Sequence, residues 1–302
     1  MNTRRHFLSR AAGLTAAGFL ARRAWPLLPA SPAAGSRGAL AWPHPIGLQI
    51  YTVRREWARD PLGTLEAVAR IGYREVELID VEKTPAASLR RWLRQTRLRA
   101  VGGHFGYGHT AAHWQRIADL ARRVGLRYVV CPFANAADAA GWQKIAASFN
   151  LAGRICQRAG LQFAYHNHLQ EFRPVGNTTG YAILAAHTDP RLVQLEMDVF
   201  WLTYAGQDPI AYFHRYPGRY TLLHVKDMKK RLGYRWNPRQ FPPRGRDPFT
   251  EAGRGRIDWR AIFAHARLAG VRHIFVEQDQ TRRPPLQAAA ISYDYLRRLR
   301  LG

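Results

Sequence analysis

The 302-residue sequence has little of several features that would each point to a particular class of protein. Its only two cysteines, Cys131 and Cys156, form no CxxC pair and no Cys/His metal spacing, which excludes a disulfide scaffold and a zinc-finger type of site. The apolar stretch near the start, residues 11–21, is well short of the roughly twenty residues that a membrane-spanning helix needs. No glycine-rich phosphate loop follows Ile50 and Tyr51, which counts against a doubly wound nucleotide-binding sheet.

Acidic residues are also scarce. Only 21 Asp and Glu stand against 46 Lys and Arg, so the formal net charge is +25. Arginine suits phosphate recognition, and a nucleic-acid partner therefore has to be considered. The arginines, however, are spread over nearly every expected helix and loop and form no basic tail. We expect a solvated arginine-rich surface and no nucleic-acid partner.

The first residues differ in composition from the rest. Residues 4–8 read RRHFL, which resembles the Arg-Arg-x-Phe-Leu pattern of twin-arginine export signals. A weakly apolar stretch and a Pro/Ala-rich spacer follow. We expect residues 1–41 to be a signal peptide and spacer, read by the twin-arginine translocation machinery, and the location to be periplasmic or otherwise exported. Residues 42–302 are then expected to form a single domain.

From residue 45 onward, short β-rich runs alternate with helical patterns. The expected strands are IGLQIY (46–51), REVELI (74–79), RAVGGHF (99–105), RYVVCPF (127–133), LQFAYHNH (161–168), LVQLEMDVF (192–200), YTLLHVKD (220–227) and HIFVEQD (273–279). The expected helices between them include residues 61–71, 85–96, 111–124, 137–159 and 259–269. Several of these helices end in a glycine that leads directly into the next strand. Eight βα units in roughly 250 residues predict an α/β fold of the (β/α)8 TIM barrel type.

One connection, residues 228–258, is far longer than an ordinary βα loop and is rich in Arg, Pro, Gly and aromatics. In a barrel, an insertion after the seventh strand lies over the C-terminal mouth, where substrates bind. Its arginines, with Tyr234 and Trp236, are therefore expected to form part of a lid.

Polar residues occupy the expected C-terminal strand ends, which converge in a TIM barrel. They are Glu77, His104, His166, His168, Asp198, His224, Lys226 and Glu277. Each has an ordinary structural explanation when taken alone, and Asp198 could simply cap the helix after it. Their recurrence at the ends of four successive strands instead favours a site for one divalent metal ion. Carboxylate and imidazole ligands leave Mn, Co, Zn, Fe and Mg as candidates.

These residues lie in segments that resemble a known family. The segments are IGLQIYTVR (46–54), GYREVEL (72–78), YHNHLQEF (165–172), EMDVFWLTYAGQDP (196–209), LLHVKDM (222–228), GRGRIDW (253–259) and FVEQD (275–279). In this order they resemble the sugar phosphate isomerase/epimerase family of xylose isomerase-like TIM barrels. The resemblance implies His166, Asp198, His224 and Glu277 as metal ligands. His166 is a departure, because sugar epimerases usually have Glu at that position.

The resemblance also implies a chemistry, the removal of a proton next to a carbonyl that a metal polarises. In ketose 3-epimerases two glutamates exchange a proton on opposite faces of the sugar. Here Glu277 is expected as one base, with Glu171, His168 or His104 as candidates for the second. We expect a sugar isomerase or epimerase, and the alternative is a lyase or hydratase that acts on 3-keto-glycosides.

Other residues are candidates for holding the substrate. Lys226 lies on the same strand face as His224 and is expected to contact a substrate hydroxyl or a developing enolate oxygen. His104, Trp201 and Tyr51 are expected to line the sugar site. We expect a non-phosphorylated substrate, because an exported enzyme meets few sugar phosphates. A homo-oligomer is left open as a further partner.

Two other classes of function fit less well. The related endonuclease IV type of DNA repair enzyme has a metal-binding His three residues after the Asp of strand six, where this chain has Trp201. A non-catalytic sugar-binding protein would predict a broken ligand set, whereas this set is complete with one substitution.

Overall fold

Eight parallel strands close into a barrel in a computed structural model that describes residues 39–231 and 247–301. Around the barrel their order is β1 (Gly47–Gln49), β12 (His273–Val276), β9 (Tyr220–Val225), β8 (Val193–Asp198), β5 (Gln162–His166), β4 (Tyr128–Cys131), β3 (Arg99–His104) and β2 (Glu75–Leu78). The α/β barrel predicted from the sequence is thereby confirmed. The RRHFL motif, Tyr234 and Trp236 lie outside the described residues.

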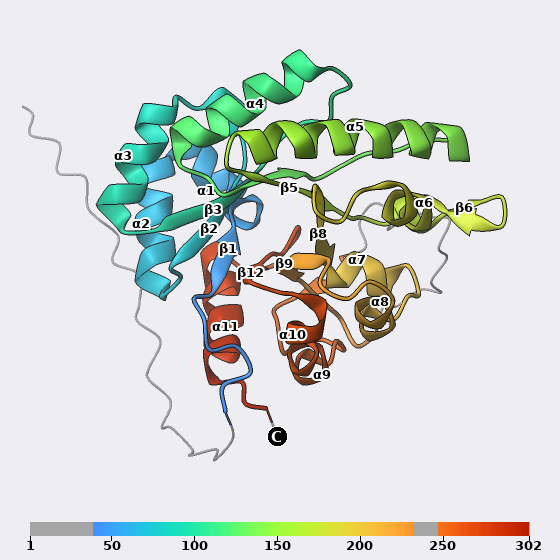
Figure 1. Cartoon of the computed structure of the whole chain (residues 1–302). Coiled ribbons are helices and arrows are strands. Elements are labelled where there is room, and N and C mark those ends of the chain that lie inside the picture. The colour runs from blue at the N-terminus through green and yellow to red at the C-terminus, as the bar shows by residue number, and fades with distance from the viewer. Residues whose placement is uncertain (1–38, 232–246, 302) are drawn as a thin grey trace, which may run out of the picture. The chain divides into compact units, whose positions relative to one another are not determined.

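Helices connect the strands and lie around the outside of the barrel (Figure 1). They are α1 (Arg54–Arg59), α2 (Pro61–Ile71), α3 (Ala86–Thr96), α4 (Ala111–Val124), α5 (Ala139–Arg158), α6 (Gly180–His187), α7 (Val199–Tyr204), α8 (Pro209–Arg215), α9 (Trp259–Ala264), α10 (Ala266–Ala269) and α11 (Pro285–Arg298). Two short antiparallel pairs are added, β6 (Pro174–Val175) with β7 (Thr178–Thr179) and β10 (Asp227–Met228) with β11 (Phe249–Thr250). Within the described residues, no helix combines the length and the apolar character that crossing a membrane requires.

The helix ends follow from local sequence. The Thr110 hydroxyl accepts a hydrogen bond from the His113 backbone N–H at the start of α4, and Gly125 ends that helix with a φ of 92°. The continuous helix expected over residues 259–269 is wrong, because α9 and α10 are separated at His265. The His265 Nδ1–H donates to the backbone carbonyl of Ala261 at 2.8 Å, which competes with the regular helical hydrogen bond.

On three strands, β5, β9 and β12, the side chains that face the barrel interior change from apolar to polar within two residues. A small apolar cluster fills it, formed by Val101, Tyr128, Val130, Ala164, Leu222 and Phe275. Ala164, Leu222 and Phe275 are followed two positions later by His166, His224 and Glu277. Since residues i and i+2 of a strand face the same side, these polar side chains lie directly above the apolar cluster. The interior is therefore a packed floor with a polar layer toward the C-terminal mouth.

Candidate functional site

The polar side chains at the strand ends come together at the mouth of the barrel. His104, His166 and Asp198 are the last residues of β3, β5 and β8, and His224 is the last but one of β9. Glu277 directly follows β12. The last four of these five residues are at most 5% exposed, so they have exchanged water for one another.

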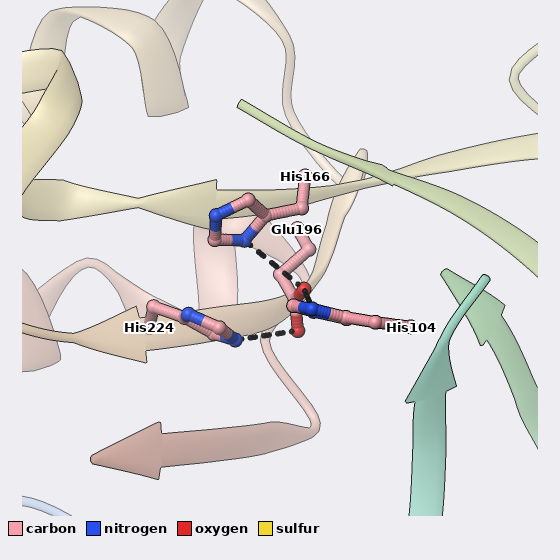
Figure 2. A group of neighbouring side chains, drawn as sticks. All are labelled: His104, His166, Glu196 and His224. Atoms are coloured by element: carbon pink, nitrogen blue, oxygen red, sulfur yellow. Dashed lines mark hydrogen bonds and ion pairs between the residues drawn. The ribbon is translucent and has the colours of Figure 1, made fainter. Parts of the chain in front are cut away.

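Three imidazoles surround one carboxylate, that of Glu196 on β8 (Figure 2). The distance from Glu196 Oε2 is 3.2 Å to His166 Nδ1 and 3.6 Å to His104 Nε2, and Glu196 Oε1 lies 3.4 Å from His224 Nε2. The four residues offer ligand atoms that all lie within 4.8 Å of one another, as a metal site requires. We call His104, His166, Glu196 and His224 the lower group, because Glu196 precedes Asp198 on β8.

A second set with the same property consists of His166, Asp198, His224 and Glu277. We call it the upper group, and it is the ligand set that the family resemblance implied. His166 Nε2 lies 3.8 Å from Asp198 Oδ2, and His224 Nδ1 lies 2.8 Å from Glu277 Oε2. The two groups share His166 and His224, and each shared imidazole turns one nitrogen toward each group.

Lys226 lies among the carboxylates of the upper group. Its Nζ is 2.7 Å from Glu277 Oε2, 2.8 Å from Asp198 Oδ2 and 2.9 Å from Asp279 Oδ1. Burial alone would lower the pKa of Lys226, but the three carboxylates raise it well above its ordinary value. The lysine is therefore a buried ammonium at neutral pH.

Glu277 and Asp279, which follow β12 and both contact Lys226, differ in their pKa values. Burial opposes ionisation of Glu277, but Lys226 and His224 outweigh it and hold the pKa of Glu277 well below its ordinary value. Burial raises the pKa of Asp279 to about 6, and Lys226 only partly offsets it. At neutral pH Glu277 is thus ionised, and Asp279 titrates close to neutrality.

The histidines of the site also differ from one another. Burial disfavours a charged His104, yet Glu77 and Glu196 raise its pKa to about 9. Burial and the neighbouring His224 instead lower the pKa of His166 well below its ordinary value. The pKa of His168 falls to about 3, chiefly through burial. The structure thus places neutral imidazoles beside charged ones.

Both carboxylate oxygens of Glu171 form hydrogen bonds within and beside the turn after β5. Its Oε1 accepts a hydrogen bond from the Tyr165 hydroxyl, and its Oε2 accepts one from the His168 backbone N–H at 3.1 Å. Burial raises the pKa of Glu171 to about 7. Both oxygens of this candidate base are therefore engaged in holding the turn that carries His168.

The three residues expected to line the sugar site differ in position. His104 belongs to the lower group, and the Trp201 ring lies 5.5 Å from Lys226 Nζ and 5.7 Å from the His168 ring. Tyr51 is 41% exposed, with the Arg54 guanidinium 4.2 Å from the centre of its ring. His104 and Trp201 thus belong to the polar cluster, and Tyr51 lies at the surface beside Arg54.

Sequence reasoning missed two residues, Glu196 and Asp279. Glu196 stands two positions before Asp198 on the same strand face, and Asp279 two positions after Glu277. The two-residue period of a strand is the signal that could have found both. Asp198 also has the ordinary structural role of capping α7, because its Oδ1 accepts a hydrogen bond from the Trp201 backbone N–H at 2.9 Å. Its other oxygen nevertheless faces Lys226.

Comparison with known proteins gives matches over most of the barrel. The profile of the xylose isomerase-like TIM barrel family matches residues 65–299. A curated inosose dehydratase of Geobacillus kaustophilus (strain HTA426) is 30% identical over 164 residues, 52% of this chain and 53% of that protein. The chain thus spans about half the length of the curated relatives it matches.

Solved structures share the fold across nearly their whole length. A sugar phosphate isomerase/epimerase from Parabacteroides distasonis ATCC 8503 superposes with a TM-score of 0.74 at 23% identity, over 90% of this chain and 98% of that one. An IOLI protein with a bound zinc atom superposes with a TM-score of 0.60 at 13% identity, over 84% of this chain and 98% of that one. At these identities the likeness concerns the fold.

Proposed function

The chain belongs to the xylose isomerase-like TIM barrel family, and from this premise we propose that it is a metal-dependent dehydratase of a non-phosphorylated keto-sugar or cyclic keto-polyol. One observation carries the proposal: Glu277 and Asp279 lie 2.7 and 2.9 Å from the same ammonium, that of Lys226, and their pKa values are pushed apart. At neutral pH Glu277 is ionised and so can accept a proton, and Asp279 keeps a protonated fraction that can donate one to a departing hydroxyl.

The reaction is an elimination next to a carbonyl. Glu277 takes the proton from the carbon beside the carbonyl, the electron pair forms a carbon–carbon double bond, and the carbon–oxygen bond on the next carbon breaks. Asp279 gives its proton to the departing hydroxyl, which leaves as water. The Lys226 ammonium stabilises negative charge that develops on the carbonyl oxygen. The product is an unsaturated ketone, or the dione that follows from it when the carbon that lost the proton bears a hydroxyl.

A divalent metal fits the residues present. His166 and His224 belong to both candidate groups and would hold it, together with carboxylate oxygens. Glu196 Oε1 is buried and, within the part of the chain that the structure describes, has no hydrogen-bond partner. Mixed imidazole and carboxylate donors suit Zn, Mn, Co or Fe better than Mg. When bound, the ion supplies Lewis-acid polarisation of the carbonyl, which makes the neighbouring C–H more acidic.

The matched relatives support this reaction class. Three of the matched curated proteins carry the name inosose dehydratase. An inosose is a cyclic ketone that bears several hydroxyls, which is the kind of substrate that elimination next to a carbonyl requires.

Isomerisation or epimerisation is the second candidate, and His168 favours it. Its Nδ1 is buried without a hydrogen bond among the described residues, and its low pKa keeps the ring neutral. A second group that accepts and returns a proton is what an epimerase needs beyond Glu277. Whether the proton returns to carbon or a hydroxyl leaves decides between the two reactions.

Incubation of the metal-loaded protein with inososes, ketoses and 3-keto-glycosides in deuterated water tests the proposal. A dehydratase releases one water and gives a product with the ultraviolet absorption of a conjugated ketone or dione. Deuterium on one carbon of an intact skeleton would assign an isomerase or epimerase instead. Activity on phosphorylated sugars alone would contradict the proposed substrate class.

Two substitutions separate the proposed roles. Glu277→Gln is expected to lower kcat by at least about 100-fold, because it removes the base. Asp279→Asn is expected to lower elimination by a similar factor while exchange of the substrate C–H with deuterium continues. Equal loss of exchange and elimination in Asp279→Asn would count against its role as the acid.

The expected export, the proposed lack of a nucleic-acid partner and a homo-oligomeric state remain predictions. A fusion of residues 1–41 to a folded reporter tests the first, since a twin-arginine signal requires both Arg4 and Arg5. Replacement of both by Lys is expected to abolish translocation of the reporter.

A further inference from the structure

We propose that Ala39-Leu40-Ala41 stays in the exported protein and is not the site at which the leader is cut. This segment is the only Ala-x-Ala sequence among the first 42 residues, and signal peptidases cut after such a sequence. From the sequence alone, cleavage after Ala41 is therefore expected. The inference goes beyond the proposed function and does not depend on it, because the segment precedes β1 and so lies at the end of the barrel away from the mouth.

The segment pairs with the last described residues of the chain, which follow α11. The Ala41 backbone N–H donates to the Leu299 carbonyl at 2.9 Å, and the Leu301 backbone N–H donates to the Ala39 carbonyl at 2.9 Å. Between these two hydrogen bonds lies an antiparallel bridge at residue 40. The two ends of the described chain are thus held side by side (Figure 1). We call the paired segments, residues 39–42 and 299–301, the terminal clasp.

The side chains on both sides of the expected cut are buried. Ala41 and Trp42 are each 5% exposed. The centre of the Trp42 ring lies 5.9 Å from that of Phe263 on α9, and the indole N–H donates to the Pro45 carbonyl at 3.1 Å. A peptidase that binds its substrate as an extended strand needs the backbone groups that the clasp already uses. The bond after Ala41 is therefore protected until the segment leaves the barrel.

A cut after Ala41 would also destabilise its own product. The shortened chain would begin with an ammonium on Trp42, a residue that is almost completely buried. The Leu299 carbonyl and the Leu301 N–H would lose their hydrogen-bond partners. The compact unit that holds the barrel accordingly includes residues 39–41 as well as the residues after them. The inference therefore moves the start of the expected domain from residue 42 to Ala39.

The order of events in export makes this protection relevant. The twin-arginine route, which is expected from residues 4–8, carries proteins that have already folded. The peptidase then meets the clasp in place, so the Ala-x-Ala pattern alone does not select the bond that is cut. A cut on the N-terminal side of Ala39 leaves both hydrogen bonds of the clasp intact.

Limited digestion of the purified full-length protein with elastase, which accepts small side chains, tests the clasp. Mass spectrometry measures the rate of cleavage after Ala41. A synthetic peptide of residues 36–47, in which the same bond is free, is the reference. Cleavage in the folded protein is expected to be at least about 100-fold slower than in the peptide, because it requires local opening. Equal rates in the protein and the peptide would overturn the proposal.

Two variants open the clasp in different ways. Trp42→Ala removes the buried indole, and Leu301→Pro removes one backbone donor and keeps the indole. Each is expected to raise the rate of cleavage after Ala41 by about 10-fold or more, relative to a peptide of the same sequence. Leu268→Ala, at an exposed position of α10, is the control and is expected to leave the rate unchanged. Circular dichroism verifies that each variant folds, and unchanged rates in both folded clasp variants would contradict the clasp.

The N-terminus of the exported protein gives an independent result. The full-length chain is produced in a host that has the twin-arginine machinery, and the protein purified from the periplasm is sequenced from its N-terminus. It is expected to begin at or before Ala39, and a chain that begins at Trp42 would overturn the proposal. Neither measurement uses metal binding or catalytic activity, so failure of the proposed function would leave both results unchanged.

Discussion

Glu171 is a buried carboxyl group whose surroundings oppose its ionisation. Its pKa is raised to about 7 by burial, against an ordinary value of 4.5. The protonated form is thus favoured by folding. This carboxyl contributes stability that is fully present below pH 4.5 and is lost as the pH rises through 7.

Glu171→Gln keeps the shape of the side chain and removes its ionisation. We expect the free energy of unfolding of the wild-type protein to fall relative to that of the variant between pH 5 and 8, by at most about 1.4 kcal/mol per pH unit. Urea unfolding at several pH values, in the presence of a chelator, measures the difference. Glu66→Gln on the surface of α2 is the control for loss of one charge. A pH-independent difference for Glu171→Gln would show that its pKa is not raised.

At the scale of single residues, the sequence predicted which residues lie at the strand ends, but it did not predict which contacts their side chains make. His166, Asp198, His224 and Glu277 were expected together and do lie together. The carboxylate oxygens that contact Lys226 could not be predicted, because these contacts depend on side-chain positions that no local sequence pattern encodes. Lys226 was expected to meet substrate, but its three carboxylate contacts follow only from closure of the barrel.

At the scale of elements, the two-residue period of the strands explains both the success and the misses. Strand order and the alternation of strands with helices follow from local patterns, which is why the barrel could be predicted. Glu196 lies inside β8 and so was counted with the strand, although its side chain faces the same interior as that of Asp198. Its partner His104 comes from β3, which is not adjacent to β8 in the barrel, so only the closed sheet brings them together.

The side chain of Asp227 on β10 connects the two ends of the long connection after β9, which are residues 227–228 and residues 253–259. Its carboxylate accepts hydrogen bonds from the backbone N–H groups of Met228, Gly253, Gly255 and Ile257 and from the indole N–H of Trp259. A single buried carboxylate thus joins β10 to the segment that leads into α9. Each of these donors would lose a charged acceptor if the carboxylate were removed.

Asp227→Asn is expected to lower the free energy of unfolding by about 1–3 kcal/mol, because an amide presents a donor where the protein also presents donors. Urea denaturation of the purified protein measures this change. Asp119→Asn on the exposed face of α4 is the matched control and is expected to change stability by less than about 0.5 kcal/mol. Equal stability of the two variants would mean that Asp227 does not hold the segment.

For the barrel as a whole, the distribution of charge matters more than the net value. The chain carries +25, yet some of its scarce acids gather inside the mouth. These are Glu77, Glu196, Asp198, Glu277 and Asp279. Lys226 and the protonated His104 offset part of this negative charge. A bound divalent cation would offset the remaining repulsion among the carboxylates that folding brings together.

Zinc is consequently expected to stabilise the whole barrel. At a free concentration about 100 times its dissociation constant, a ligand specific for the native state adds about 2.7 kcal/mol. For a barrel of this size, that corresponds to a rise in Tm of roughly 5–10 °C. Differential scanning calorimetry with and without a chelator measures the shift. His224→Ala is expected to lose most of the shift, because His224 belongs to both candidate ligand groups. A wild-type Tm that does not respond to zinc would contradict the metal site.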